Sequence, residues 1–297
     1  MEKIIQSFKN LYLGDGILKK HLGILALLFI PALFCGIAGF IDKDMPKEVM
    51  IVIGVIVLIF ALLCIVPCVF LNGLFISFVK DRLNSITGIP KIRTTTFIEG
   101  LKVLPLQIVW GLYLLVVLGC ISLLFFIPLM SLFSQGSNPH TSLILLTIGG
   151  FLVFFLLTML FCILICPFMN YIYIDYVNEG KLCRYLFNPL KIFDYMKKAF
   201  KETMLVFVKF WVVAIVGSLV SGIFQLLAVF FGFGIGVLAV LTTSEANSDV
   251  AIYTPIWATS LILLSSVVVL IHAYITTMIG YAAVENYIGV YKEKITE

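Results

Sequence analysis

Charge is scarce in this sequence, and its scarcity excludes most soluble folds. Only 12% of the 297 residues are Asp, Glu, Lys or Arg, about half the share of a typical soluble domain, whereas 62% are hydrophobic. A soluble domain of this length cannot bury so much apolar surface, because the buried fraction is limited by chain size. The composition therefore predicts an all-α integral membrane protein, a polytopic bundle of transmembrane helices.

Motifs of catalysis and metal binding are also missing. The chain has no GxxxxGK[ST] phosphate-binding loop, no HExxH zinc motif and no GxSxG nucleophile motif. Its three histidines are scattered, and its cysteines never form the CxxC pair of a zinc site. No nucleic-acid-binding module is recognisable. The sequence therefore predicts no catalytic residue, no cofactor and no metal, and it favours a protein that is not an enzyme.

The seven cysteines are an odd number, and six of them lie inside long apolar runs. A disulfide framework instead uses an even number of cysteines in a small secreted domain. We therefore expect free thiols that are buried as small apolar residues.

Six stretches are long and apolar enough to cross a bilayer, which takes about 20 residues of helix. They are residues 22–41, 49–78, 104–133, 142–174, 204–241 and 256–284. The segments "IIQSFKNLYLGDGILKK" (4–20), "IRTTTFIEGLKVLPL" (92–106) and "LKIFDYMKKAFKETMLVFV" (190–208) mix apolar and charged residues. They are typical of amphipathic helices at the inner membrane surface.

Lysine and arginine are distributed unequally around these six stretches. Eighteen of the 20 cations precede the first stretch, follow the last, or lie in or beside the second-to-third and fourth-to-fifth connections. Such an excess marks the cytoplasmic side of a membrane protein. We therefore expect a multi-pass protein of the cell (cytoplasmic) membrane with both termini in the cytoplasm.

Some of these cations are candidates for contacts with anionic lipid headgroups, which contribute about 1 kcal/mol each near such a surface. The candidates are Lys19, Lys20, Arg93, Lys102, Lys197, Lys198 and Lys201. The alternative is an ordinary positively charged flank that binds no particular lipid.

A repeat with a step of 98 residues runs through the chain. "CIVPCVFLNGLFISFVKD" (64–81) pairs with "CILICPFMNYIYIDYVNE" (162–179), which aligns Asn72 with Asn170. Phe97 and Tyr195 follow at the same step. The repeat predicts one membrane domain built from three related helical hairpins, about residues 1–80, 81–180 and 181–297, with copies in the same orientation.

Two longer segments carry a family resemblance. "RLNSITGIPKIRTTTFIEGLKVLPLQIVWGLY" (82–113) and "EGKLCRYLFNPLKIFDYMKKAFKETMLVFVKFWVV" (179–213) resemble the prokaryotic membrane family named domain of unknown function 4013. The resemblance implies a multi-pass helical protein. It implies no known reaction and no catalytic residue.

Five polar side chains fall inside the apolar stretches: Asn72, Gln107, Asn170, Gln225 and His272. An amide in hydrocarbon is costly unless it is bonded, so Asn72 and Asn170 are expected to face each other or a shared interior. The five residues then form either structural bonds between helices or a polar pathway. His272 is either a hydrogen-bonded packing residue or part of a proton relay or ligand site.

Helix ends and small residues give two further expectations. Asp175, Glu179 and Glu285 lie near the inner ends of apolar stretches. Asp175 and Glu179 are one turn apart and are expected to form a solvated or lysine-paired helix end. "GSLVSG" (217–222) supplies small residues for close helix packing, within the chain or in a homo-oligomer.

Two classes of function remain open on the sequence. The first is a non-enzymatic membrane scaffold, assembly factor or subunit of a larger membrane complex, which the few polar residues and short outer connections favour. The second is a transporter or channel for a small or amphipathic solute. The expected partners are membrane lipids and either a membrane-protein complex or a second copy of the chain, and not nucleic acid.

Overall fold

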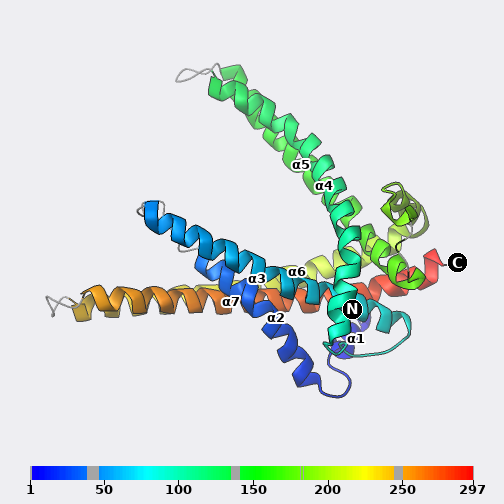
Figure 1. The fold of residues 1–297 in the computed structure, drawn as a ribbon. Helices are drawn as coiled ribbons and strands as arrows, with labels where there is room; N and C mark the ends of the chain where they lie inside the picture. The colour runs from blue at the N-terminus through cyan, green and yellow to red at the C-terminus, as the bar shows by residue number, and fades with distance from the viewer. Residues whose placement is uncertain are drawn as a thin grey trace. The chain divides into compact units, whose positions relative to one another are not determined.

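The computed structural model describes residues 2–38, 47–134, 141–180, 182, 184–243 and 250–296. Within these ranges all regular secondary structure is helical, which confirms the all-α class (Figure 1). The helices are α1 (Glu2–Leu11), α2 (Ile17–Ala38), α3 (Lys47–Leu83), α4 (Thr94–Ser134), α5 (Thr141–Glu179), η1 (Arg184–Phe187), α6 (Lys191–Thr243), α7 (Val250–Val290) and η2 (Tyr291–Ile295).

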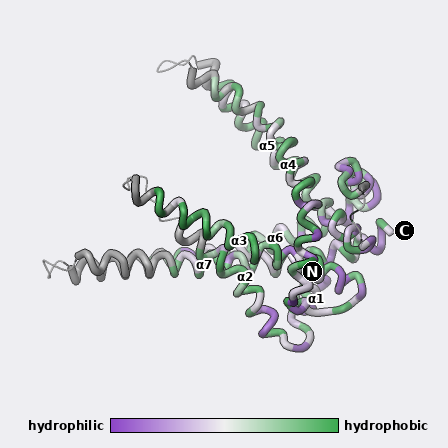
Figure 2. Tube along the Cα trace, viewed as in Figure 1, coloured by the Kyte–Doolittle hydropathy of each residue, from purple (hydrophilic) through white to green (hydrophobic). Residues whose placement is uncertain are grey.

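Five apolar stretches within these helices are long enough to cross a membrane. They are Gly54–Leu83, Thr94–Leu123, Leu145–Glu179, Lys191–Ala228 and Leu263–Ile295. Figure 2 shows hydrophobic residues along most of the described length of α3, α4 and α5. These stretches make the chain an integral membrane protein. The expected first span, residues 22–41, falls mostly on α2, and its last residues lie outside the described part of the chain.

The chain divides into two compact units, and each is described by itself. The first comprises Met1–Leu101 and Val208–Asn286, and the second comprises Lys102–Phe207 and Tyr287–Glu297. Three helices, α4, α6 and α7, therefore contribute to both units.

In the first unit, α1 is amphipathic, as the sequence predicts. Its buried residues, Ile4, Ser7 and Leu11, lie three and four positions apart and so share one helix face. The amide of Asn286 in α7 donates a hydrogen bond of 2.8 Å to the Ser7 hydroxyl. The amphipathic face of α1 is therefore held against another part of the protein.

The crossing of α3 with the first turns of α4, also in the first unit, depends on glycine. A Cβ atom on Gly73 would lie 1.7 Å from the carbonyl oxygen of Thr96, and one on Gly100 would lie 2.0 Å from that of Val69. Only a residue without a side chain allows two helix backbones to approach this closely. Hydrophobic contact beside the crossing is made by Phe70 and Phe97.

The small residues of α6 pack against α7 within the first unit. A Cβ atom on Gly217 would lie 2.8 Å from the side chain of Ile279, so the two helices are in close contact there. One turn further along α6, the buried Ser221 hydroxyl lies 2.8 Å from Nδ1 of His272. The "GSLVSG" segment therefore packs within the chain, as one of the two sequence expectations proposed.

In the second unit, α6 changes direction close to its start. Ala199 has non-helical backbone angles (φ −136°, ψ 29°), which separate the amphipathic first turns from the apolar span. Beyond this break, the Thr203 hydroxyl lies 2.6 Å from that of Tyr171 in α5. The 3-10 turn η1 is fixed to α4 because the Trp110 indole donates to the carbonyl oxygen of Leu186 at 2.9 Å.

The cysteines differ from the sequence expectation. Cys64, Cys68, Cys120, Cys162 and Cys166 are free thiols, as expected, but Cys68, Cys120 and Cys162 are exposed and the other two are half-buried. The prediction that these cysteines are buried inside the protein is therefore wrong. In a membrane, an apolar thiol needs no protein neighbour, because the hydrocarbon around a span provides the same apolar environment.

Candidate functional site

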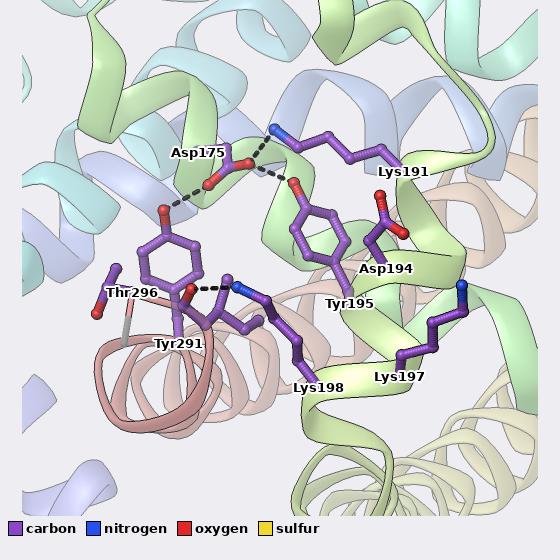
Figure 3. Close-up of a pocket in the computed structure, with 9 residues that line it drawn as sticks. Asp175, Lys191, Asp194, Tyr195, Lys197, Lys198, Tyr291 and Thr296 are labelled. Carbon is purple, nitrogen blue, oxygen red and sulfur yellow. Dashed lines mark hydrogen bonds and ion pairs between the residues drawn. The ribbon is translucent and has the colours of Figure 1, made fainter.

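A buried carboxylate at the end of α5 organises the most polar cluster of the second unit. Asp175 accepts hydrogen bonds from the Lys191 ammonium group and the Tyr195 hydroxyl on one oxygen, and from the Tyr291 hydroxyl on the other (Figure 3). The Asp175 residue is only 7% exposed. A buried carboxylate is stable only when it is paired and its oxygens accept hydrogen bonds, and both conditions are met here.

Local sequence explains why these donors converge on one carboxylate. Lys191 opens α6 and Tyr195 follows four residues later, so both side chains lie on the same face of one helical turn. Tyr291 comes from η2, the last turn of the chain. The cluster therefore ties α5, α6 and the C-terminal turn together.

A pocket of about 550 Å³ lies beside this cluster. Lys198 in its wall donates a hydrogen bond of 3.1 Å to the carbonyl oxygen of Ile295, and the exposed Asp194 and Lys197 also line it (Figure 3). With three donors already bound, Asp175 acts as a structural acceptor that fixes the wall of the pocket. The exposed ammonium groups are the part of the pocket that can meet an anion.

The first unit contains an ionic cluster of the same kind. Arg82 at the end of α3 pairs with Glu285 of α7 at 2.8 Å, and its side chain is 4% exposed. The Asn10 amide donates to the second carboxylate oxygen of Glu285, and the guanidinium group lies 4.6 Å from the centre of the Phe78 ring. This cluster joins α3, α7 and the end of α1.

A histidine cluster lies next to the start of α2 in the first unit. The ring of His21 stacks on Tyr12 with centroids 4.7 Å apart, and its Nδ1 lies 2.6 Å from the Tyr274 hydroxyl. Its Nε2 is buried. Burial, the largest effect, lowers the pKa of His21, a hydrogen bond with the Leu11 backbone opposes this shift, and the charge of the adjacent Lys20 lowers the pKa further.

The five polar residues of the apolar stretches have local partners or stand exposed. His272 is bonded to Ser221, Asn170 donates to the Pro167 carbonyl oxygen of its own helix, and Gln107 is hydrogen-bonded to Tyr173 of α5. Asn72 is half-buried in α3, and Gln225 is exposed on α6. Asn72, Gln225 and His272 belong to the first unit, and Gln107 and Asn170 to the second. A shared interior for the two asparagines and a continuous pathway remain predictions.

The candidate headgroup lysines and arginine occupy several places. Lys19 and Lys20 line a second pocket, in the first unit, while Lys197 and Lys198 line the pocket beside Asp175. Arg93, Lys102 and Lys201 are exposed. Their contact with lipid remains a prediction.

Sequence reasoning expected Asp175 at a helix end to be either solvated or paired with lysine, and the structure shows the lysine pair, with Lys191. The carboxylate is buried, however, and the two tyrosine donors were missed. The repeat holds the signal that could have found them. Its register aligns Asp175 with Ser77 and Tyr195 with Phe97, so the second copy gains an acid and a hydroxyl at matched positions.

Comparison with known proteins gives one match. The family model described as "Protein of unknown function (DUF4013)" matches residues 56–226, which is more than half of the chain. No curated protein matches. No solved structure matches. Among the described residues, no group of three or more His, Cys, Asp or Glu side chains is placed to hold a metal ion.

Proposed function

This chain belongs to the DUF4013 family of proteins of unknown function. We propose that it is a non-enzymatic membrane protein that acts as a scaffold, an assembly factor or a subunit of a larger membrane complex. We further propose six spans arranged as three related hairpins in the cell membrane, with both termini in the cytoplasm. The family description leaves the molecular role open, so the proposal rests on the residues themselves.

The observation that carries the proposal is the local bonding of the polar side chains within the membrane helices. A transport pathway needs polar groups that are free to bind a solute in turn. Here the Asn170 amide is already bonded to the preceding turn of its own helix, and Gln107 bonds to Tyr173 of the neighbouring helix. The second kind of bond holds two helices in fixed positions, which is the task of a scaffold.

The helix ends support the same role. The Asp175 and Arg82–Glu285 clusters each join three chain segments that are distant in the sequence, through buried charges. Removing one member of a buried ion pair typically costs about 3–5 kcal/mol, so such clusters fix their segments firmly. The apolar part of α5, by contrast, exposes large side chains such as Leu145, Phe151 and Leu156. Lipid or the helices of a partner can cover these side chains.

The arrangement as related hairpins has support from one matched position of the repeat. The 98-residue step aligns Phe97 with Tyr195, and each of these rings packs against an aromatic ring of the preceding long helix, Phe70 of α3 and Tyr171 of α5. The two partner positions are not aligned by the step. The Lys and Arg distribution supports cytoplasmic termini.

The mass of the protein extracted from its own membrane without detergent tests the scaffold proposal. Polymer-bounded discs keep native neighbours, and native mass spectrometry then weighs the complex. We expect a defined particle that contains the 33.2 kDa chain together with a second protein or a second copy at a fixed ratio. A single chain with lipid alone would contradict the proposal.

One observation favours the alternative, a transporter or channel for a small or amphipathic solute. His272 is an ionisable residue inside a membrane helix, and such residues commonly mark solute or proton pathways. Its bond to Ser221 gives it a partner that could pass a proton. Proteoliposomes that carry a proton gradient provide the test, because a pathway predicts a proton flux that is lost in His272→Gln.

A further inference from the structure

A pocket of about 770 Å³ in the first unit has a charged end and an apolar end along one face of α2. Lys19 and Lys20 lie at its charged end, and Gly23 and Leu27 lie further along the same helix. The positions 19, 20, 23 and 27 share one side of a helix, and the eight steps from residue 19 to residue 27 span about 12 Å. Charge therefore gives way to apolar surface over roughly two turns.

A second segment that lines the pocket also combines a charged residue with an apolar one. This segment precedes α4, and Lys91 and Ile92 are adjacent in it. The Ile92 side chain lies against Gly23, since a Cβ atom on that glycine would come within 2.6 Å of it. Lys91 adds a third ammonium group to the charged end, and Ile92 extends the apolar end.

Charges around the pocket leave it positive. Asp15 also lines it, and Asp81 lies within the electrostatic reach of Lys20 and Arg93. Three lysines against one lining carboxylate attract an anion. Ammonium groups bind phosphate as point charges, and cationic pockets between membrane helices accept phospholipid headgroups.

We propose that this pocket binds one anionic phospholipid, with its phosphate ester held by the three lysines and the upper part of an acyl chain along the apolar wall. The proposal rests on the cytoplasmic orientation proposed above for the start of α2, which places the charged end at the headgroup level of the inner leaflet. A soluble phosphate ester shares the headgroup chemistry. It has no chain for the apolar wall, so the phospholipid is the better match.

The test titrates the purified full-length chain in neutral-detergent micelles and measures binding by native mass spectrometry. The probes are phosphatidylglycerol, phosphatidylcholine with the same chains, and glycerol 3-phosphate. We expect one phosphatidylglycerol to bind at least about tenfold more tightly than phosphatidylcholine, because only the former carries net charge. Glycerol 3-phosphate should bind much more weakly, because it gains nothing from the apolar wall.

Variants locate the site. Removing three ammonium groups in Lys19→Gln, Lys20→Gln, Lys91→Gln should weaken phosphatidylglycerol binding roughly 100-fold, at about fivefold per lysine. The matched control removes three exposed lysines outside the pocket, Lys3→Gln, Lys9→Gln, Lys292→Gln, and should change binding less than about threefold. The corresponding triple exchange of the pocket lysines to arginine should retain binding, which guards against a loss that reflects misfolding.

The apolar wall is tested by Ala26→Trp, which fills the groove from an exposed position of α2 without changing charge. It should weaken phosphatidylglycerol binding at least about tenfold and leave glycerol 3-phosphate unaffected. Equal losses in the pocket triple and the control triple would overturn the site. The assignment of a phospholipid as the ligand would be overturned if glycerol 3-phosphate bound as tightly as phosphatidylglycerol and Ala26→Trp left phosphatidylglycerol binding unchanged.

This outcome can be separated from that of the scaffold proposal. Lipid titration reports on the pocket of an isolated chain, whereas native particle mass reports on protein partners. A native particle that contains a single chain and no partner, together with retained selectivity for phosphatidylglycerol, would contradict only the scaffold proposal. An outward position of the start of α2, shown by labelling a cysteine at Lys19 from the outer side, would contradict the orientation on which the lipid proposal rests.

Discussion

Replacing Asp175 with asparagine tests whether the buried cluster of the second unit holds its segments together. The change removes one negative charge and keeps the size of the side chain. Asparagine keeps one acceptor oxygen for a tyrosine hydroxyl, and its NH2 group, which can only donate, faces the other hydroxyl. The Lys191 ammonium group loses its counter-ion, so the ion pair is the main interaction that the substitution removes.

The expected loss follows from burial. Breaking a buried ion pair by removing one partner costs about 3–5 kcal/mol. The Lys191 side chain is 19% exposed and can reach water, so the lower end applies and Asp175→Asn should cost about 3 kcal/mol. Asp175→Leu also leaves the hydroxyls of Tyr195 and Tyr291 without an acceptor, at about 1–3 kcal/mol each, and should cost about 6 kcal/mol in total.

The assay is chemical unfolding in mixed micelles, followed by the fluorescence of one tryptophan. Trp110 belongs to the same unit, and its indole bond to Leu186 should be lost on unfolding, so Trp211 and Trp257 are replaced by phenylalanine. Asp194→Asn is the matched control, because it removes the same charge from an exposed position of the same pocket. The control should stay within about 0.5 kcal/mol of the parent. An equally small effect of Asp175→Asn would refute the reasoning.

Two further predictions concern the first unit and its packing. Gly73→Ala should destabilise the protein by about 3 kcal/mol, because the added Cβ collides with the Thr96 carbonyl. Gly111→Ala is the control, because a Cβ atom there meets nothing within 4 Å. It should be neutral or stabilise the protein by up to about 1 kcal/mol. Equal unfolding free energies for the two variants would contradict the close crossing of α3 and α4. The lowered pKa of His21 means that folding favours its neutral form. The folding stability that depends on neutral His21 is therefore present above the unfolded pKa of about 6.5 and is lost as pH falls below that value. Unfolding free energies between pH 7.5 and 5.5 should fall more steeply in the parent than in His21→Gln, and identical slopes would show that His21 is not buried in its neutral form.

The sequence was sufficient to predict the helices because their signal is local. A run of about 20 apolar residues can only be helical in a bilayer, where every backbone group must be bonded within the segment. The same holds for α1, whose buried face follows from the spacing of Ile4, Ser7 and Leu11. Family membership was also recognisable, because the two segments that carry the resemblance, 82–113 and 179–213, fall within residues 56–226, which the family model matches. Both segments contain charged residues and glycine between apolar runs.

The polar clusters were harder to predict because their members are distant in the sequence. Arg82 donates a hydrogen bond to Glu285, which lies 203 residues further along the sequence. Tyr291 donates to Asp175, which lies 116 residues before it. No periodicity links such positions, and a single sequence gives no pairwise signal. The cysteine prediction failed for a different reason. Cys68 and Cys162 are on exposed faces of their helices, and hydropathy alone cannot distinguish the lipid from the protein interior.

Photo-crosslinking from α5 in native membranes tests the central claim, that exposed faces of the spans take a protein partner, most directly. A diazirine amino acid is placed at Leu145, Leu152 or Leu156, three exposed positions on one side of the helix, and at the buried Leu106 of α4 as a control. The scaffold account predicts one protein adduct of the same mass from all three α5 positions and none from Leu106. Lipid adducts alone at the three α5 positions would contradict it.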